Sequence, residues 1–228
     1  MVLDLSGAIR LATIHDVDAL TELHCASFKR EEHVPMLLGR SYVKATYMWL
    51  VTSKDAYALV ADLTGQVIGL LGASDRPFAW PMFKACFGAM VLNVAKNPSL
   101  LFEEQIWLRA FRRPKHRKKA AGDIFNLPGI AQMTIGAVDA RYRGQGIFDR
   151  LIEASRETSR ARGSRAIVGG VYKRNSSSRR VFMKSGWLEV PELETMETVF
   201  YLSLLESVMS DDLKSALGLN GSIPVHSD

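Results

Sequence analysis

Two glycines and two arginines stand within six residues of one another, in Arg141-Tyr142-Arg143-Gly144-Gln145-Gly146. Glycine lets the backbone approach a ligand closely and adopts conformations that other residues avoid. The arginines supply fixed positive charge, and the first N–H groups of a following helix would have no partner inside that helix. Such a segment is suited to hold an anion, and we expect a pyrophosphate.

The segments on either side of this turn predict the elements that would position it. Ile130–Val138 is short and apolar, as a buried strand would be. After the turn, apolar residues recur at helical spacing, namely Ile147, Phe148, Leu151, Ile152 and Ala154. A dinucleotide-binding fingerprint would need a third glycine where the chain has Asp149, and the Gly-Lys-Ser/Thr of a P-loop is absent.

A second patterned segment follows a strand-like segment at 166–172. Asn175 is suited to cap a short helix in which Val181 and Phe182 point inward, and Gly186 would end that helix. Trp187 then stands where the next strand would begin. The order is therefore strand, turn, helix, strand and short capped helix, with both patterned segments at the carboxyl ends of predicted strands.

Together the two segments resemble the acyl-CoA-binding signatures of the GNAT superfamily of N-acyltransferases. Residues 141–146 match the first signature, Arg/Gln-x-x-Gly-x-Gly/Ala, at every defining position. Residues 175–187 resemble the second, Asn-x-x-Ala/Ser-x-x-x-Tyr-x-x-x-Gly-Phe, and the resemblance covers about residues 130–190. The chain differs from the second signature at one position. The Tyr that is often assigned as proton donor to the CoA thiolate is here Phe182, which has no exchangeable proton.

The resemblance implies direct transfer of an acetyl group from acetyl-CoA to a primary amine of a small molecule, without an acyl-enzyme intermediate or a metal. It implies that acetyl-CoA is bound by Gly136, Ala137, Val138, Arg141, Arg143, Gly144, Gln145, Gly146, Ile147, Asn175, Arg179 and Phe182. A backbone N–H within 136–138 would polarise the thioester carbonyl, a role that needs no particular side chain.

Phe182 leaves the departing thiolate without an assigned proton donor. Tyr172, Tyr201 and a hydroxyl among residues 176–178 are the alternatives, and Tyr172 is the predicted catalytic residue among them. The ordinary pKa of a thiol is about 8.5, so the thiolate would also leave with little help or through water.

The attacking amine must lose a proton, so a base or a water relay is expected. The predicted strand at 130–138 holds no carboxylate. The candidates lie in the loop between the first two predicted helices and at the end of the hairpin, namely Glu31, Glu32, His33 and Asp75, of which Glu32 and Asp75 are predicted as catalytic. Asp139 is a poorer candidate because it belongs to the turn that would hold the cofactor.

The first third of the chain fits the same architecture. A strand at 9–12 would precede two helices, of which the first begins near residue 16 and the second spans 34–51. Two strands at 57–63 and 66–73 would then form a hairpin around Thr64-Gly65. We predict an α/β protein with the GNAT fold, whose mixed central sheet is splayed at the cofactor and flanked by helices. It would form a single domain at 1–205, followed by a tail or closing helix at 206–228.

A helical and basic insertion interrupts this pattern at about 76–127. Apolar and aromatic residues suggest two helices broken near Asn97-Pro98, and residues 112–119 carry six fixed positive charges. The insertion could be a packed helical hairpin, a lid over the acceptor site or a membrane-surface element. Residues 109–119 would suit an anionic membrane or a substrate that carries a diphosphate, whereas nucleic acid is not expected. Similar insertions occur in GNAT-like proteins of surface-glycan synthesis, so we expect an amino sugar as acceptor.

Composition sets the remaining expectations. The chain has 228 residues, of which 47% are hydrophobic, and this is enough to form a sizeable core. Its formal net charge is +5. Cys25 and Cys86 lack a metal-ligand pattern, no signal-peptide pattern is present, and the longest apolar segment, 85–95, is too short to span a bilayer. We expect a cytoplasmic protein, with membrane-peripheral contact as an option. The alternatives are a long-chain acyl-CoA N-acyltransferase and a non-catalytic acyl-CoA-binding module.

Overall fold

A computed structural model describes residues 9–30, 33–102 and 124–217. Glu31, Glu32 and residues 109–119, for which the sequence predicts roles, lie outside the described residues. The strands are β1 (Ile9–Leu11), β2 (Ala56–Leu63), β3 (Gln66–Ser74), β4 (Ile130–Val138), β5 (Ala166–Tyr172), β6 (Leu188–Glu189) and β7 (Thr198–Leu204). The helices are α1 (Val17–Ser27), α2 (Val34–Leu37), α3 (Arg40–Thr52), α4 (Ala79–Lys96), α7 (Ile147–Ala161), α8 (Ser176–Lys184) and α9 (Asp211–Ala216). Short 3-10 turns lie at Ile14–Asp16, Pro98–Phe102, Ile124–Asn126, Ala140–Tyr142 and Pro191–Leu193.

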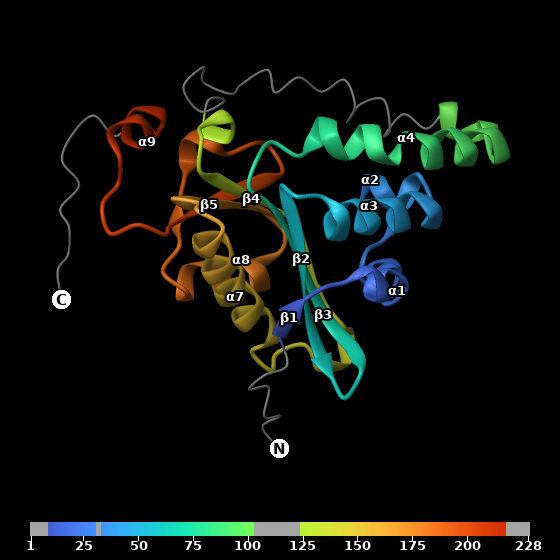
Figure 1. The fold of residues 1–228 in the computed structure, drawn as a ribbon, viewed down its shortest axis with the longest axis horizontal. Helices are drawn as coiled ribbons and strands as arrows, with labels where there is room; N and C mark the ends of the chain where they lie inside the picture. The colour runs from blue at the N-terminus through green and yellow to red at the C-terminus, as the bar shows by residue number, and fades with distance from the viewer. Residues whose placement is uncertain (1–8, 31–32, 103–123, 218–228) are drawn as a thin grey trace.

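The seven strands form one mixed sheet in the order β1-β2-β3-β4-β5-β7-β6. Strands β4 and β5 run parallel, and the other neighbours run antiparallel. Helices α1 and α3 cover one face of the sheet and α7 covers the other, which gives three layers (Figure 1). The predicted α/β fold with a mixed sheet flanked by helices is confirmed.

Strand β2 contributes to the core on both faces of the sheet. Tyr57, Leu59 and Ala61 pack in the cluster that includes α7, whereas Ala56, Ala58 and Val60 pack in the cluster that includes α1 and α3. A strand that is buried on both faces gains from apolar side chains at every position, which explains why 56–61 is an unbroken apolar segment rather than an alternating one.

The sheet opens between β4 and β5. Their pairing is confined to three residues of each strand, from Ile130 opposite Ala166 to Gln132 opposite Val168. On its other side β4 pairs with β3 as far as Val138, with a register shift that leaves Thr134 as the extra residue of a β-bulge. Beyond Gln132 the edge of β4 that faces β5 therefore has no strand partner among the described residues.

The segment predicted as one helix at 34–51 is two helices. Gly39, at φ +91°, separates α2 from α3, and only glycine adopts such a conformation readily. In the insertion, the predicted first helix is α4, which packs on α3 through Cys86 and Met82. The predicted second helix lies mostly outside the described residues. Helix α9 packs beside β4, β5 and β7, so the described part of the tail contributes to the core.

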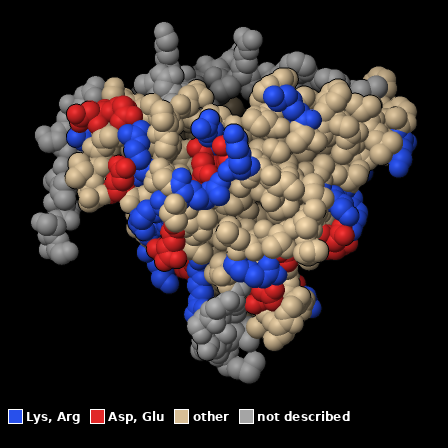
Figure 2. Space-filling model, viewed as in Figure 1, with Lys and Arg blue, Asp and Glu red and all other residues tan. Residues whose placement is uncertain are grey.

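The outer side of α4 is apolar and exposed. Trp80, Phe87 and Val91 are about half exposed or more. Figure 2 shows that the surface over α3 and α4, on the right of the view, carries few charged side chains. No helix among the described residues combines the length and the apolar character needed to cross a lipid bilayer.

Candidate functional site

Two cavities meet where β4 and β5 separate. The first, of about 660 Å³, lies beside the turn 139–146 and is called the turn cavity here. The second, of about 520 Å³, is called the aromatic cavity. Six residues line both cavities, namely Phe28, Gly136, Phe148, Tyr172, Asn175 and Ser178, so a ligand in one would adjoin a ligand in the other.

The two glycines of the turn have backbone conformations that other residues rarely adopt. Gly144 has φ +77° and Gly146 has φ +75°, and Gly146 is the N-cap residue immediately before α7. A Cβ added at either position would meet no atom within 4 Å. The backbone angle, not crowding, therefore requires glycine here. Ile147, only 2% exposed, anchors the first turn of α7 in the core, so the first N–H groups of this 15-residue helix border the turn cavity.

Four cationic side chains line the turn cavity, namely Arg143, Arg174, Arg180 and Lys184. Arg143 Nε donates a hydrogen bond to the carbonyl of Val138 over 3.1 Å, which fixes the base of its guanidinium beside the end of β4. Asp149 is an acidic lining residue, and its carboxylate lies 3.9 Å from Lys184 Nζ. The cavity thus combines fixed positive charge with the positive end of a helix dipole.

The structure brings most of the predicted cofactor residues to the turn cavity. Those that line it are Gly136, Ala137, Val138, Arg143, Gly144, Gly146, Ile147 and Asn175. Asn175 caps α8 as predicted, because its Oδ1 accepts a hydrogen bond from the Ser178 N–H over 3.0 Å. Phe182 instead lines the aromatic cavity, where its ring stacks on Tyr201 at a centroid distance of 5.1 Å.

Arg141, Gln145 and Arg179 lie outside the lining of both cavities. The Arg141 guanidinium bonds the Asp139 carboxylate over 2.6 Å and holds the pKa of that carboxyl below its ordinary value. Arg179 Nε donates to the hydroxyl of Tyr201 over 3.2 Å. The cavity receives the neighbouring residue, Arg180, because residues 177, 180, 181 and 184 share one face of α8.

The unpaired edge of β4 offers backbone groups to the gap. The Asp139 N–H donates to the carbonyl of Ile68 on β3. Because N–H groups alternate in direction along a strand, the N–H groups of Gly136 and Val138 point away from β3, toward β5. This edge could pair with an extended ligand as a further strand would.

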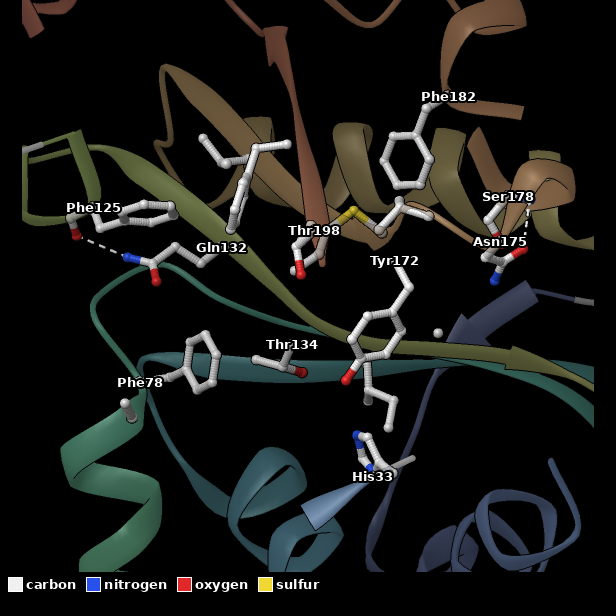
Figure 3. Close-up of a pocket in the computed structure, with 18 of the residues that line it drawn as sticks. His33, Phe78, Phe125, Gln132, Thr134, Tyr172, Asn175, Ser178, Phe182 and Thr198 are labelled. Carbon is white, nitrogen blue, oxygen red and sulfur yellow. Dashed lines mark hydrogen bonds between the residues drawn. The ribbon is translucent and has the colours of Figure 1, made fainter. Parts of the chain in front are cut away.

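The aromatic cavity is lined by six phenylalanines, namely Phe28, Phe78, Phe125, Phe148, Phe182 and Phe200. Figure 3 shows Phe78, Thr134, Tyr172 and His33 around its space, with the Gln132 side chain held at one end. Gln132 Nε2 donates to the carbonyl of Phe125 over 2.8 Å. Thr134 Oγ1, at the bulge of β4, is buried and has no hydrogen-bond partner among the residues that the structure describes.

A chain of hydrogen bonds leads from the aromatic cavity into the core. His33 lines the cavity, its ring stacks on Phe28, and its Nδ1 lies 3.1 Å from His24 Nε2. His24 Nδ1 lies 2.9 Å from the hydroxyl of Tyr47. Burial lowers the pKa of His24 to about 3, and burial also raises the pKa of Tyr47 well above its ordinary value. Both buried groups are therefore neutral at ordinary pH.

The predicted catalytic residues have different surroundings. Tyr172, at the end of β5, lines both cavities, and the guanidinium carbon of Arg174 lies 5.0 Å from its ring centre. Asp75 lies in neither lining, and its Oδ2 accepts from Arg162 Nε over 2.7 Å. Glu32 is outside the described residues. Ser178 also lines both cavities, whereas Tyr201 lines neither.

The fold is that of the GNAT acetyltransferases. The structure resembles the GNAT domain of PAT from S. lividans, at 14% identity and a TM-score of 0.55, over 86% of this chain and 89% of that one. It also resembles yncA from Salmonella typhimurium, solved with its cofactor acetyl-CoA, at 16% identity and a TM-score of 0.53, over 89% and 95% of the chains. An N-acetyltransferase from Staphylococcus aureus Mu50 has 15% identity and a TM-score of 0.51, over 87% and 98% of the chains.

Comparisons of sequence alone give no match. No protein-family model matches the chain, and no curated protein matches it. The similarity to solved structures therefore lies in the overall fold.

Proposed function

We propose that this protein is an N-acetyltransferase that binds acetyl-CoA in the turn cavity and transfers the acetyl group to a primary amine bound in the aromatic cavity. One observation carries the proposal, namely that an unpaired edge of β4 runs between the two cavities and ends at a glycine turn that begins α7. The turn is suited to a pyrophosphate, and the edge is suited to an extended amide chain.

The residues of the turn cavity fit CoA in charge and in shape. Arg143, Arg174, Arg180 and Lys184 match the negative charge of its phosphates. Gly144 and Gly146 keep side chains away from the space in front of the α7 N-terminus. The N–H groups of Gly136 and Val138, which point into the gap, would bond the pantetheine amides or polarise the thioester carbonyl.

Acetyl-CoA supplies an activated acyl carbon and a thiolate leaving group. The amine nitrogen forms a bond to that carbon, the carbon–sulfur bond breaks, the nitrogen loses a proton, and the sulfur gains one. We assign the proton for the sulfur to Tyr172, because its side chain lines both cavities and Phe182 has no proton to give. His33 is the described residue best situated to receive the proton from nitrogen. Glu32 stays a prediction, and Asp75 has no part in this mechanism because it pairs with Arg162 outside the cavities.

Two finer predictions from the sequence concern the acceptor and the acyl group. An amino sugar stays a predicted acceptor, as does contact of residues 109–119 with a diphosphate or an anionic membrane. A long acyl group has one observation in its favour, since the aromatic cavity of about 520 Å³ adjoins the turn cavity and is mostly apolar. The non-catalytic alternative differs from both in releasing no thiol with any amine.

Thiol release from acetyl-CoA tests the proposal directly. The assay would use amino sugars with and without a nucleotide diphosphate, amino acids, polyamines and monoamines, while calorimetry measures CoA binding to the same protein. Release that depends on an amine supports the enzyme. CoA binding without release from acetyl-CoA or octanoyl-CoA supports the non-catalytic module, and absence of CoA binding overturns the assignment of the turn cavity.

A further inference from the structure

The aromatic cavity carries no full charge on any described lining residue. Its lining includes six phenylalanines and several aliphatic side chains, and none of the described lining residues is Asp, Glu, Lys or Arg. His33 and Tyr172 are its titratable groups. The adjoining turn cavity, by contrast, is lined by four cations. The two halves of the site thus differ sharply in polarity.

From this contrast we infer that the acceptor is a monoamine with an uncharged, apolar body the size of one aromatic ring, bound with its amine near Thr134 and His33. The inference rests on the proposed function and names the substrate class of the same site. The six phenylalanines provide flat apolar surfaces for a ring, and contacts between aromatic rings are favourable beyond the apolar area that they bury. A site lined in this way excludes a second charge on the acceptor, because a buried charge without a partner is costly.

Three classes of acceptor fit less well. A polyamine keeps a second ammonium group, and no described lining residue has a carboxylate to pair with it. A nucleotide-linked amino sugar carries a diphosphate, which would need cations where the described cavity has aromatic rings. Amino acids present a carboxylate and meet the same difficulty.

The apolar lining also bears on the chemistry of the amine. Removal from water disfavours the charged ammonium form, which lowers the pKa of the bound amine. A larger fraction of bound amine is then neutral and nucleophilic, so that a strong carboxylate base is less necessary. Thr134 lines the cavity, and its buried Oγ1 at the bulge has no hydrogen-bond partner in the described part of the chain, so this hydroxyl can serve the amine nitrogen as a partner. This agrees with a β4 that holds no carboxylate.

The same apolar space could instead receive a long acyl chain from the donor. The two alternatives make opposite predictions for donor and acceptor size. If the space receives the acceptor, acetyl-CoA with a bulky monoamine is the efficient pair. If it receives the acyl chain, octanoyl-CoA with a small amine is the efficient pair.

The test is a matrix of kcat/KM values for acetyl-CoA and octanoyl-CoA against 2-phenylethylamine, ethylamine, putrescine and glucosamine. We expect kcat/KM for acetyl-CoA with 2-phenylethylamine to exceed that with putrescine or glucosamine by at least about tenfold. Preference for putrescine, glucosamine or the octanoyl-CoA–ethylamine pair overturns the inference but leaves acyl transfer intact. Absence of turnover with every pair contradicts the proposed function itself.

A pair of variants, one at the N-cap of α4 and one within α4, tests where the acceptor binds. Phe78 lines the aromatic cavity, whereas Phe87 is about half exposed on α4 and lies outside it. Phe78→Ala should lower kcat/KM for 2-phenylethylamine relative to ethylamine by about tenfold, while Phe87→Ala should leave that ratio unchanged. An unchanged ratio in a folded Phe78→Ala protein overturns the assignment, and the wild-type matrix decides the substrate class if the variant does not fold.

Discussion

The Nδ1 atom of His33 lies 3.1 Å from Nε2 of His24, which places a cavity residue in direct contact with a fully buried neutral imidazole. Tyr47 continues the chain from the other ring nitrogen of His24. A neutral imidazole has one donor and one acceptor nitrogen, so the proton positions of the three residues are linked. For His33 to receive a proton at Nε2, its Nδ1–H must donate to His24, and His24 must donate to the Tyr47 oxygen.

Burial of His24 predicts that acid destabilises the protein. The pKa of His24 is about 3 in the folded protein and about 6.5 in the unfolded chain, so the unfolded chain binds the proton more tightly. Its contribution to stability is complete above pH 6.5 and is lost as the pH falls toward 3. Between pH 6.5 and 4.5 the free energy of unfolding should fall by about 2 kcal/mol from this group, measured by urea unfolding.

Two variants isolate that effect. His24→Gln should lower stability at pH 7 through lost packing. It should also make the free energy of unfolding depend less steeply on pH between 6.5 and 4.5. His15→Gln, a change at an exposed histidine before α1, should keep the wild-type slope. An unchanged slope in His24→Gln would show that the buried imidazole does not govern this range. Asp16, whose pKa Arg10 lowers to about 2, contributes only at lower pH.

The proposed role of His33 as proton acceptor predicts a pH-dependent loss of activity. His33→Gln should lower kcat/KM about a hundredfold at pH 7, because the amine then lacks a proton acceptor. The loss should shrink toward pH 9.5, where more of the free amine is already neutral. Steady-state kinetics from pH 6 to 9.5 measures the effect. A loss of equal size at every pH would indicate that His33 acts as a hydrogen-bond donor to the substrate instead.

Local patterns in the sequence predicted the elements around the turn cavity. The strand Ile130–Val138, the helix that begins at Ile147 and the Asn175 cap are each encoded within a few neighbouring residues. The split at Gly39 was missed because apolar spacing continues across it, although a glycine there could have been taken as a signal.

The aromatic cavity depends on contacts between distant parts of the chain. His24 and Tyr47 are 23 residues apart, and no spacing rule joins them to His33. The aromatic cavity likewise collects single phenylalanines from separate elements, which become a lining only when the sheet forms. Arg180 could have been found, since it shares a helical face with Ser177 and Lys184, whereas Arg179 faces Tyr201.

The proposed role of Tyr172 as proton donor predicts that its loss slows turnover and leaves CoA binding unchanged. Tyr172→Phe removes the hydroxyl and keeps the ring, so kcat should fall by about tenfold to a hundredfold while the Kd of CoA stays the same. Tyr201→Phe is the matched control, because Tyr201 is fully buried, bonds Arg179 and lines neither cavity. Wild-type kcat in Tyr172→Phe would assign the proton to water or Ser178.

Substitution of a glycine in the turn should weaken CoA binding, and a control glycine can separate this effect from the effect of backbone strain on stability. Gly146→Val places a branched side chain at φ +75°, in the space proposed for the pyrophosphate. Gly163→Val is a matched control, since Gly163 has φ +85°, an equally open Cβ position and no part in either cavity. Both variants should lose similar stability. Only Gly146→Val should weaken CoA binding, by at least about tenfold, or about 1.4 kcal/mol. Equal CoA affinities would contradict the pyrophosphate assignment.

Two adjacent arginines on α8 provide the sharpest test of the charge in the turn cavity. Arg180 lines the cavity, whereas Arg179 bonds the hydroxyl of Tyr201. Arg180→Ala should raise the Kd of CoA about tenfold at low salt, and the difference from wild type should narrow as salt screens the phosphates. Arg179→Ala removes the same charge one position away and should change the Kd of CoA little, because its contacts lie outside the cavity. Calorimetry of CoA binding at two salt concentrations measures both variants. A larger loss in Arg179→Ala would mean that CoA phosphates lie toward β6 and β7 rather than along the face of α8 that carries Ser177, Arg180 and Lys184.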